Sequence, residues 1–449
     1  MATSAIRAER NRILALADDV WRTPELGFKE HKTAERVSRF LSELGLTVRT
    51  GLALTGVKAV AEGRSKSGSS PGRPCVGVLG ELDAVICRAH PDADPLTGAV
   101  HACGHHAQLA VMAGAAVGLT SPGVLNHLSG SVAFMATPAE EYVEITYRLE
   151  LRRKGAIEFL GGKPELIRLG EFDDVDMVIL VHAGGAGGTV MSVGGSANAF
   201  AAKSVRYAGQ EAHAGASPWL GLNALNSATL AISAINALRE TFNEEDCIRV
   251  HPIITKGGDL VNIVPADVRL ETYVRARSLQ AVLDTSAKVD RAFKAGALAM
   301  GTVVEIQDLP GYLPMTTEPK LARLFRRNMI MVAGVEHVRE GGHMSASTDM
   351  GDMAQVMPAL HPHAAGVVGH PHSSDFRVVD PDRAYIMPAE AVAMTVIDLL
   401  ADGARKAVSI RDNYRAAMTR AEYVEYARSM FRRTVFPEEG LGRMTSDGD

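Results

Sequence analysis

The chain has 449 residues, of which 46% are hydrophobic and 22% charged, the ordinary proportions of a soluble globular protein. A chain of this length is expected to form two domains. The formal net charge is only −5 and no basic stripe runs along the sequence, which argues against nucleic acid as a partner because phosphate binding needs clustered Lys and Arg. The nearest basic run, Arg152-Arg153-Lys154, is interpreted as a solvated helix face.

The sequence gives no indication of export or membrane insertion. Residues 1–13 are polar and charged and do not resemble a secretory signal, and no apolar run reaches the roughly eighteen residues of a membrane span. The four cysteines do not resemble a disulfide framework in a chain this long. We therefore expect a cytoplasmic protein without membrane partners, in which a cysteine flanked by histidines is more often a metal ligand or a catalytic group.

The first 195 residues alternate between helix and strand patterns, which predicts an α/β layer with a mostly parallel sheet. A segment rich in Gly, Ser and Pro, residues 63–73, is predicted to be a surface loop. The predicted helices cover residues 5–21, 32–44 and 107–119, and the predicted strands cover residues 57–61, 76–79, 131–136 and 177–181.

After Gly195 the pattern changes to antiparallel-type strands with two helices, which predicts a compact α+β unit. We expect a catalytic metal-binding domain of residues 1–195 and 315–449, interrupted by an inserted α+β dimerisation or lid domain of residues 196–314. The inserted strands are expected at 201–207, 267–275 and 302–307 and its helices at 223–238 and 279–300, and two further helices at 319–333 and 388–403 complete the first domain.

The segment His101-Ala102-Cys103-Gly104-His105-His106 is the densest group of candidate ligands. Cysteine thiolate and imidazole both bind borderline divalent metals. The side chains of Cys103 and His105 can converge on one ion because Gly104 lets the backbone between them bend. The alternative is a loop that is merely rich in histidine, since short Cys/His matches have a real false-positive risk.

Two adjacent carboxylates, Glu140 and Glu141, follow the strand pattern that ends at residue 136. Open α/β sheets place ligands at the carboxyl ends of strands. Adjacent side chains point in different directions, so one carboxylate can bind a metal while the other faces a water, as general-base hydrolysis requires. Taken alone, the pair would be interpreted as two solvated glutamates in a loop.

Further histidines stand at strand ends and near the C-terminus. A single histidine at a strand end is more often structural than a ligand. Here several strand ends of one domain carry a Cys, His or Glu, and this convergence predicts one metal-centred site. The additional candidates are His182, after the strand pattern 177–181, and the cluster His361, His363, His370 and His372.

Together these segments resemble the peptidase M20 family, and more closely its amidohydrolase branch (subfamily D) of aminoacylases, hippurate hydrolases, indole-acetyl amino-acid hydrolases and aminobenzoyl-glutamate hydrolases. The resemblance extends over nearly the whole chain and implies a two-domain metallohydrolase fold. The motifs that carry it are residues 24–28, 80–85, 101–105, 138–141, 210–214, 262–265, 273–275 and 347–352.

The resemblance also implies roles for individual residues. Glu140 would be the general base. His213 would stabilise the oxyanion from the inserted domain, often across a dimer interface in this family, while Asn262 and Arg275 would contact the substrate or its carboxylate. The choice of His372 over His370 rests on aligning residues 372–376 with the family's last-ligand motif. The implied ligands of two divalent metal ions, Mn²⁺ or Zn²⁺, are Cys103, His105, Glu141, His182 and His372.

The sequence departs from the family pattern beside these residues. His106 stands where this branch usually carries Asp or Asn, and Tyr142 replaces a common glycine. Residues 87–98 lengthen the approach to the metal loop, and residues 147–172 form an unusually long excursion. These changes border the implied active site. They leave the identity of the substrate open, but they do not alter the residues implied in the metal chemistry.

We therefore expect a homodimer or larger oligomer that hydrolyses a small-molecule amide: an N-acyl or aroyl amino acid, or a dipeptide-like substrate. One alternative keeps the metal but deaminates an aromatic amine, as a 5-nitroanthranilate-type aminohydrolase does. Another is a non-catalytic binding protein on the same scaffold, against which the presence of Glu140 and of the full ligand set argues.

Overall fold

The computed structural model describes residues 1–65, 72–184 and 188–438, so part of the predicted loop 63–73 lies outside the described residues. The chain divides into two compact units. Unit 1 comprises Met1–Ser196, Thr316–Gly342 and Asp352–Tyr423, and unit 2 comprises Ala197–Met315, His343–Gly351 and the chain from Val424 on. The predicted division assigned all of residues 315–449 to the catalytic domain, whereas residues 343–351 and 424–438 group with the insert.

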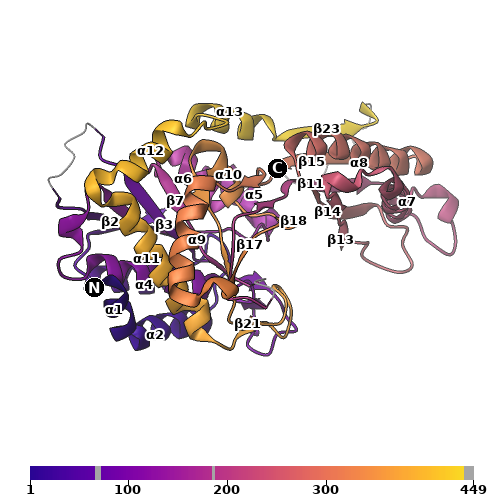
Figure 1. Ribbon diagram of the computed structural model, residues 1–449. Coiled ribbons are helices and arrows are strands. Elements are labelled where there is room, and N and C mark those ends of the chain that lie inside the picture. Colours follow the sequence, from indigo (N-terminus) through magenta and orange to yellow (C-terminus); the bar gives the residue numbers. More distant parts are fainter. Residues whose placement is uncertain (66–71, 185–187, 439–449) are drawn as a thin grey trace. The chain divides into compact units, whose positions relative to one another are not determined.

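The central sheet of unit 1 has six strands in the order β1-β2-β6-β3-β7-β19. Strands β2, β3 and β7 of this sheet are labelled in Figure 1. The pairs from β6 to β19 are parallel, and the pairs β1/β2 and β2/β6 are antiparallel, so the predicted mostly parallel sheet is present. Its strands are β1 (Val48–Leu52), β2 (Gly56–Glu62), β3 (Cys75–Glu81), β6 (Ser131–Thr137), β7 (Met177–Ile179) and β19 (Ala359–Leu360).

Helix α4 (His105–Thr120) lies at the centre of unit 1, where it packs against β3, α1, α2 and α11. Its small residues permit close packing: a Cβ added at Gly114 would stand 2.7 Å from the Cβ of Ala389 on α11. The single helix predicted over residues 5–21 is in fact two helices that meet at Glu9. The other helices of this part of the chain are α1 (Ala2–Ala8), α2 (Arg10–Trp21), α3 (His31–Glu43), α5 (Ile145–Arg153), α6 (Gly162–Leu169), α9 (Pro319–Ala333), α11 (Met387–Leu400) and α12 (Arg405–Asn413).

Among the described residues, no single helix is long and apolar enough to span a membrane, although one bent pair, residues 382–400 with 402–413, passes the same test of length and composition at a bend of 68°.

Several short strands lie outside the two large sheets. A four-stranded sheet, β17-β9-β20-β8, brings His182 beside His363 in parallel register. Its strands are β8 (His182–Ala183), β9 (Met191–Val193), β17 (Val338–Glu340) and β20 (His363–Ala364), and the remaining elements are β4 (Val85–Ile86), β5 (Ala99–Val100), β10 (Ser196–Ala197), β16 (Met315–Thr316), β18 (His343–Met344), β21 (Val367–Val368), β22 (Arg377–Val378), α10 (Met350–Val356) and α13 (Arg420–Ser429).

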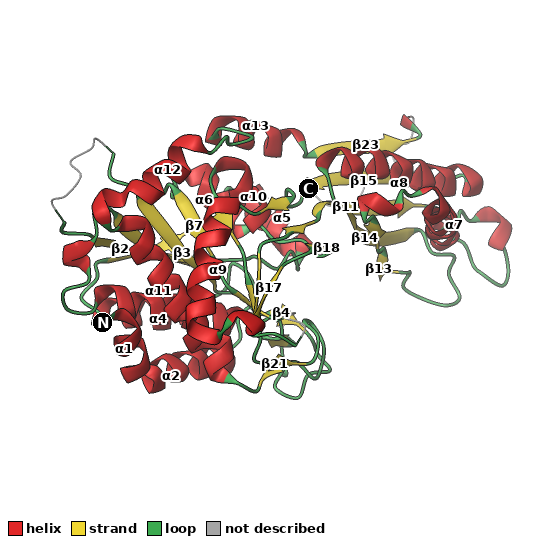
Figure 2. Cartoon of the chain, viewed as in Figure 1, coloured by secondary structure: helices red, strands yellow, loops and turns green. Residues whose placement is uncertain are grey.

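Unit 2 is an antiparallel sheet in the order β12-β14-β11-β15-β23, with β13 also on β14 and with two helices packed against it (Figure 2). Strand β14 alternates between buried residues, such as Val268, Leu270 and Val274, and more exposed residues between them. Strand β23, which joins the edge of β15 from the far end of the chain, was not predicted from the sequence. The elements are β11 (Ala199–Ala208), β12 (Arg249–Val250), β13 (Ile253–Lys256), β14 (Asp267–Ala276), β15 (Val303–Pro310), β23 (Arg432–Phe436), α7 (Ala224–Leu238) and α8 (Leu279–Met300).

Candidate metal centre

The carboxyl ends of the parallel strands of unit 1 meet at one edge of the sheet, and polar side chains gather there. Strand β3 ends at Glu81 and is followed by Asp83, while β6 ends at Thr137 and leads to Glu140 and Glu141. All these side chains are buried or nearly so. This is the edge at which open α/β sheets bind their ligands.

The loop between β5 and α4 adds a thiol and an imidazole to this edge. Gly104 adopts a φ of +94°, a left-handed conformation that favours glycine, and a side chain here would also press on Ala183 and Phe376. Helix α4 begins at His105, so Cys103 and His105 are held at the two sides of this turn. The bend expected at Gly104 is therefore present.

Three groups of side chains in the described part of the chain could each hold a metal ion, with the ligand atoms of each group within 4.8 Å of one another. Two of these groups share Cys103, which is the arrangement of two neighbouring sites with a common thiolate. Together these two contain all five ligands that the family resemblance implies. The groups are Cys103 with His105 and His182, Cys103 with Glu141 and His372, and Glu81 with His105 and Glu140.

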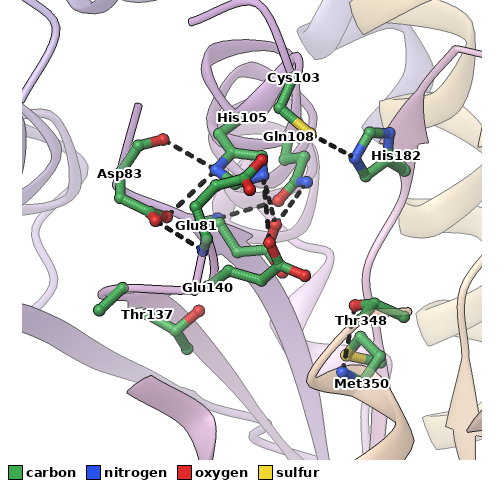
Figure 3. A network of polar contacts seen from close by, with 12 residues as sticks. Glu81, Asp83, Cys103, His105, Gln108, Thr137, Glu140, His182, Thr348 and Met350 are labelled. Atoms are coloured by element: carbon green, nitrogen blue, oxygen red, sulfur yellow. Dashed lines mark hydrogen bonds and ion pairs between the residues drawn. The ribbon is translucent and has the colours of Figure 1, made fainter. Parts of the chain in front are cut away.

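The hydrogen bonds of His105 and His182 leave one ring nitrogen of each available to a metal. His105 Nδ1 lies 2.8 Å from the Asp83 carbonyl oxygen, and His182 Nδ1 lies 2.8 Å from the Ala183 carbonyl oxygen. A carbonyl oxygen only accepts, so each Nδ1 carries a proton, and each Nε2 is the nitrogen that can offer a lone pair to a metal once it is deprotonated. His182 Nε2 lies 3.5 Å from Cys103 Sγ, as Figure 3 shows. His105 Nε2 is buried and has no hydrogen bond of acceptable geometry among the described residues.

Charges within the site favour a thiolate and a carboxylate. Burial and Glu141 raise the pKa of Cys103, but His105 and His182 lower it by more, so that the pKa falls to about 6. Burial raises the pKa of Glu141, yet His372, whose Nε2 lies 2.8 Å from the carboxylate, outweighs it and brings that pKa to about 2. The same pair raises the pKa of His372 to about 11. Since metal ligands must be deprotonated, a bound cation would replace the proton that His372 holds here. The donor set therefore fits a divalent metal.

Glu140 lies beside this cluster, with its carboxylate 3.9 Å from His105 Nε2. Glu81 also faces His105, at 3.0 Å from Nε2, but its other oxygen forms a fully buried ion pair of 2.5 Å with Lys163 on α6. Gln108 donates a further hydrogen bond to Glu81. A carboxylate that already neutralises a buried lysine is a poorer candidate for metal binding than one without such a partner, so Glu81 is better described as a support of His105.

Several candidates from the sequence do not join these groups. His370 is exposed and belongs to none of the three, whereas His372 does. His361 and His363 lie near His182, with ring centroids 5.7 Å and 5.6 Å away, but also belong to none. His101 and His106 are fully buried, and burial lowers the pKa of both.

The remaining predicted site residues belong to unit 2. His213 is exposed, and its Nδ1 accepts hydrogen bonds from the backbone N–H groups of Gly215 and Ala216. Asn262 is exposed beside Ile263, which pairs with His213 in an isolated bridge. Arg275 is partly buried, with its guanidinium 5.2 Å from the Phe200 ring centroid and 5.4 Å from that of Tyr273.

Comparisons of this chain with known proteins, by sequence and by fold, agree with one another. A sequence model of peptidase family M20/M25/M40 matches residues 78–398. The Xaa-Arg dipeptidase of Mus musculus is 28% identical over 427 residues, covering 90% of each chain. A p-aminobenzoyl-glutamate hydrolase chain of Escherichia coli (strain K12) is 29% identical over 324 residues, covering 70% of this chain and 61% of its own length. A solved dinuclear metal binding peptidase of the M20 family from Bacillus subtilis has the same fold, with a TM-score of 0.63 at 18% identity over 88% of this chain and 99% of the other.

Proposed function

The chain belongs to peptidase family M20/M25/M40 and is a hydrolase of a carbon–nitrogen bond, and we propose that it cleaves the amide bond of an N-acyl or aroyl amino acid or of a small dipeptide-like molecule. The observation that carries the proposal is the pair of ligand groups that share Cys103, with Glu140 beside them. Relatives named as a dipeptidase and as an aminobenzoyl-glutamate hydrolase support amide hydrolysis as the reaction.

We assign the five side chains of these two groups to two divalent ions. The thiolate favours Zn²⁺, but the nitrogen and carboxylate ligands also suit Mn²⁺, so both ions belong to the proposal. The backbone carbonyls that hold His105 and His182 by Nδ1 support the assignment, because they keep the lone pair of each Nε2 directed at the site.

Divalent ions bound there would lower the pKa of a coordinated water and polarise the scissile carbonyl. Glu140 would take the proton of the attacking water and pass it to the leaving nitrogen. The fixed turn of residues 138–141 keeps the Glu140 carboxylate beside His105. His213 is proposed as the donor to the oxyanion, and Asn262 and Arg275 as contacts of the substrate or its carboxylate.

We further propose that the protein assembles through unit 2. Strands β12 and β13 both pair with β14 and form one edge of its sheet, and Ile253 and Ile254 on β13 are exposed. Leu260 and Val261, in the turn that follows, are exposed as well. An exposed apolar strand edge is normally covered by a partner, and a second copy of this chain is the partner proposed here. A cytoplasmic location stays a prediction.

A substrate screen tests the proposed reaction. Metal-loaded protein is incubated with N-acyl amino acids, Xaa-Arg and other dipeptides, aminobenzoyl-glutamate and substituted anthranilates, and amine, amino-acid and ammonia release are measured separately. We expect a free amino acid with no ammonia. Ammonia released from an anthranilate, with no amino-acid fragment, would identify a deaminase instead, and binding without turnover would identify a non-catalytic protein.

A further inference from the structure

Helix α5 lies in the long excursion after the paired glutamates and carries an arginine whose side chain is fully buried. Among the described residues, the hydrogen bonds of Arg148 all go to main-chain carbonyl oxygens, and it forms no ion pair with a carboxylate. Burying a cation without a counter-ion costs free energy unless hydrogen bonds and neighbouring groups compensate for the lost solvation. An arginine in this position therefore calls for a specific task.

The carbonyls that Arg148 holds stand on the two sides of the proposed general base. Its Nη2 donates to the carbonyl of Glu141 and its Nη1 lies 3.4 Å from the carbonyl of Ala139, the residues that follow and precede Glu140. Nη1 also donates to the carbonyl of Leu160 at 2.6 Å, which ties the middle of the excursion to the same guanidinium. One planar group thus spans the backbone that carries Glu140.

The backbone at this point needs to be held. Ala139 has a φ of +50°, a left-handed conformation that is unfavourable for a residue with a Cβ. Its N–H donates to the buried Glu30 carboxyl at 2.8 Å, and its carbonyl accepts from Gly162 as well as from Arg148. A Cβ at Gly27 would overlap the guanidinium, so the N-terminal motif is also shaped around Arg148.

We propose that Arg148 is a positioning residue for the reaction: from α5 it fixes the turn of residues 139–141 so that Glu140 faces the water and Glu141 faces the metal. The inference rests on the proposed function for the roles of the two glutamates. The ring centroids of Phe28 and Tyr142 lie 5.3 Å and 5.8 Å from the guanidinium carbon, within the range of a cation–π interaction, and so help to keep the guanidinium in place.

The test compares Arg148→Met and Arg148→Lys with the matched control Arg153→Met, an exposed arginine on the same helix. Arg148→Met is expected to fold, because it removes an unpaired buried charge and two of the three carbonyls keep another donor, Gly162 N–H for Ala139 and Val143 N–H for Glu141. Arg148→Lys keeps the charge, but a lysine ammonium can reach only some of the carbonyl oxygens that the guanidinium binds. Melting temperature, kcat, KM and the absorption bands of Co²⁺-loaded protein are measured for each.

We expect both Arg148 variants to lose about 10- to 100-fold in kcat with little change in KM, and the Co²⁺ bands to shift, because the glutamates are misplaced rather than absent. Adding Ala139→Gly, which relaxes the left-handed strain, should recover part of the lost kcat. A lower melting temperature with unchanged kcat per metal-loaded chain and unchanged Co²⁺ bands would overturn the proposal, since it would make Arg148 purely structural. If the wild-type protein binds Co²⁺ but hydrolyses no amide, the proposed function fails while the Co²⁺ bands still decide the role of Arg148; if it binds no Co²⁺, both are overturned.

Discussion

At the scale of single residues, the two adjacent glutamates face different neighbours. Glu141 lies 2.8 Å from His372 and shares a group with Cys103, whereas Glu140 shares a group with His105 and Glu81. The backbone N–H of Glu141 donates to the Asp83 carboxylate at 2.8 Å. Two neighbouring carboxylates in such different surroundings are suited to different roles.

The different surroundings predict different consequences of removing each charge. Glu140→Gln should keep its metal but lose roughly 10²- to 10⁴-fold in turnover, because an amide cannot take the proton of water. Glu141→Gln should lower the metal content, because a neutral amide is a poorer ligand. Elemental analysis and kinetics on both variants decide the matter, and the opposite pattern would mean that the two roles are exchanged.

Glu30 gives a prediction about stability and pH. Burial, helped by Asp83, raises the pKa of Glu30 from 4.5 to about 7 in the folded protein. The folded state therefore binds the proton more tightly, and the contribution of Glu30 to stability is fully present below pH 4.5 and is lost as the pH rises through about 7. Glu30→Gln keeps an acceptor for Ala139 and never ionises, so it should be more stable than wild type above pH 7, by an amount on the order of 1 kcal/mol or more.

The measurement is the free energy of unfolding in urea at pH 5 and pH 8. The advantage of Glu30→Gln should be present at pH 8 and nearly absent at pH 5. Glu35→Gln, an exposed change on α3, is the control and should behave alike at both values. A Glu30→Gln variant that is equally affected at both pH values would show that ionisation of Glu30 does not limit stability.

The sequence indicated the residues that could bind a metal or transfer a proton, but not the residues that hold those side chains in position. Cys103, His105 and the paired glutamates are visible because few other functions place such residue types at strand ends. Lys163 and Arg148 gave no signal, since a lysine or arginine on a helix is usually solvated. Both lie in the excursion of residues 147–172. The burial of Lys163 depends on its ion pair with Glu81, far away in the sequence, and that of Arg148 depends on the carbonyl groups of the turn just before its own helix.

At the scale of elements, the helices with clear start signals were predicted closely. Pro319 begins α9 as predicted, and Asn223 caps α7 by accepting from the N–H of Asn226. Strand β23 could not be predicted, because no pattern in residues 432–436 indicates that they pair with β15. Two ion pairs join the strands: Arg433 donates to Glu305 through Nε and Nη2, and Arg432 Nη2 lies 3.0 Å from Asp308.

Removal of β23 should therefore damage unit 2. A chain that ends at Phe431 exposes the edge of β15 and loses both ion pairs, so we expect a lower melting temperature, by roughly 2–4 °C per kcal/mol lost, and more aggregation. A chain that ends at Glu438 keeps β23 and is the control. Thermal unfolding with light scattering measures both, and equal behaviour of the two chains would mean that β23 adds nothing to the sheet.

At the scale of the whole molecule, the change of pattern near Gly195 was a sound indication that a second unit begins, because antiparallel alternation differs from the buried parallel strands before it. The placement of residues 343–351 and of β23 in unit 2 was not accessible in this way. Short returning segments carry too little pattern of their own, and their contacts, such as that of Asn198 with the Ser345 carbonyl, are made across long stretches of sequence.

The proposed assembly through β13 can be tested by introducing charge at that edge. Ile253→Lys together with Ile254→Lys should convert the oligomer to a monomer, because two ammonium groups would be desolvated in the interface. Leu169→Lys, an equally simple change of an exposed leucine in unit 1, is the control. Light scattering measures the mass of all three proteins. A wild-type protein that is already monomeric and active would remove the proposal.

The central claim is that hydrolysis depends on metal ions held by the groups that share Cys103. The most direct measurement is the metal content of the protein, by elemental analysis, beside its turnover of the substrate that the screen identifies, before chelation, after chelation and after reconstitution with Mn²⁺ or Zn²⁺. Turnover should disappear with the metal and return as about two ions per chain are restored. Full turnover in metal-free protein would contradict the account.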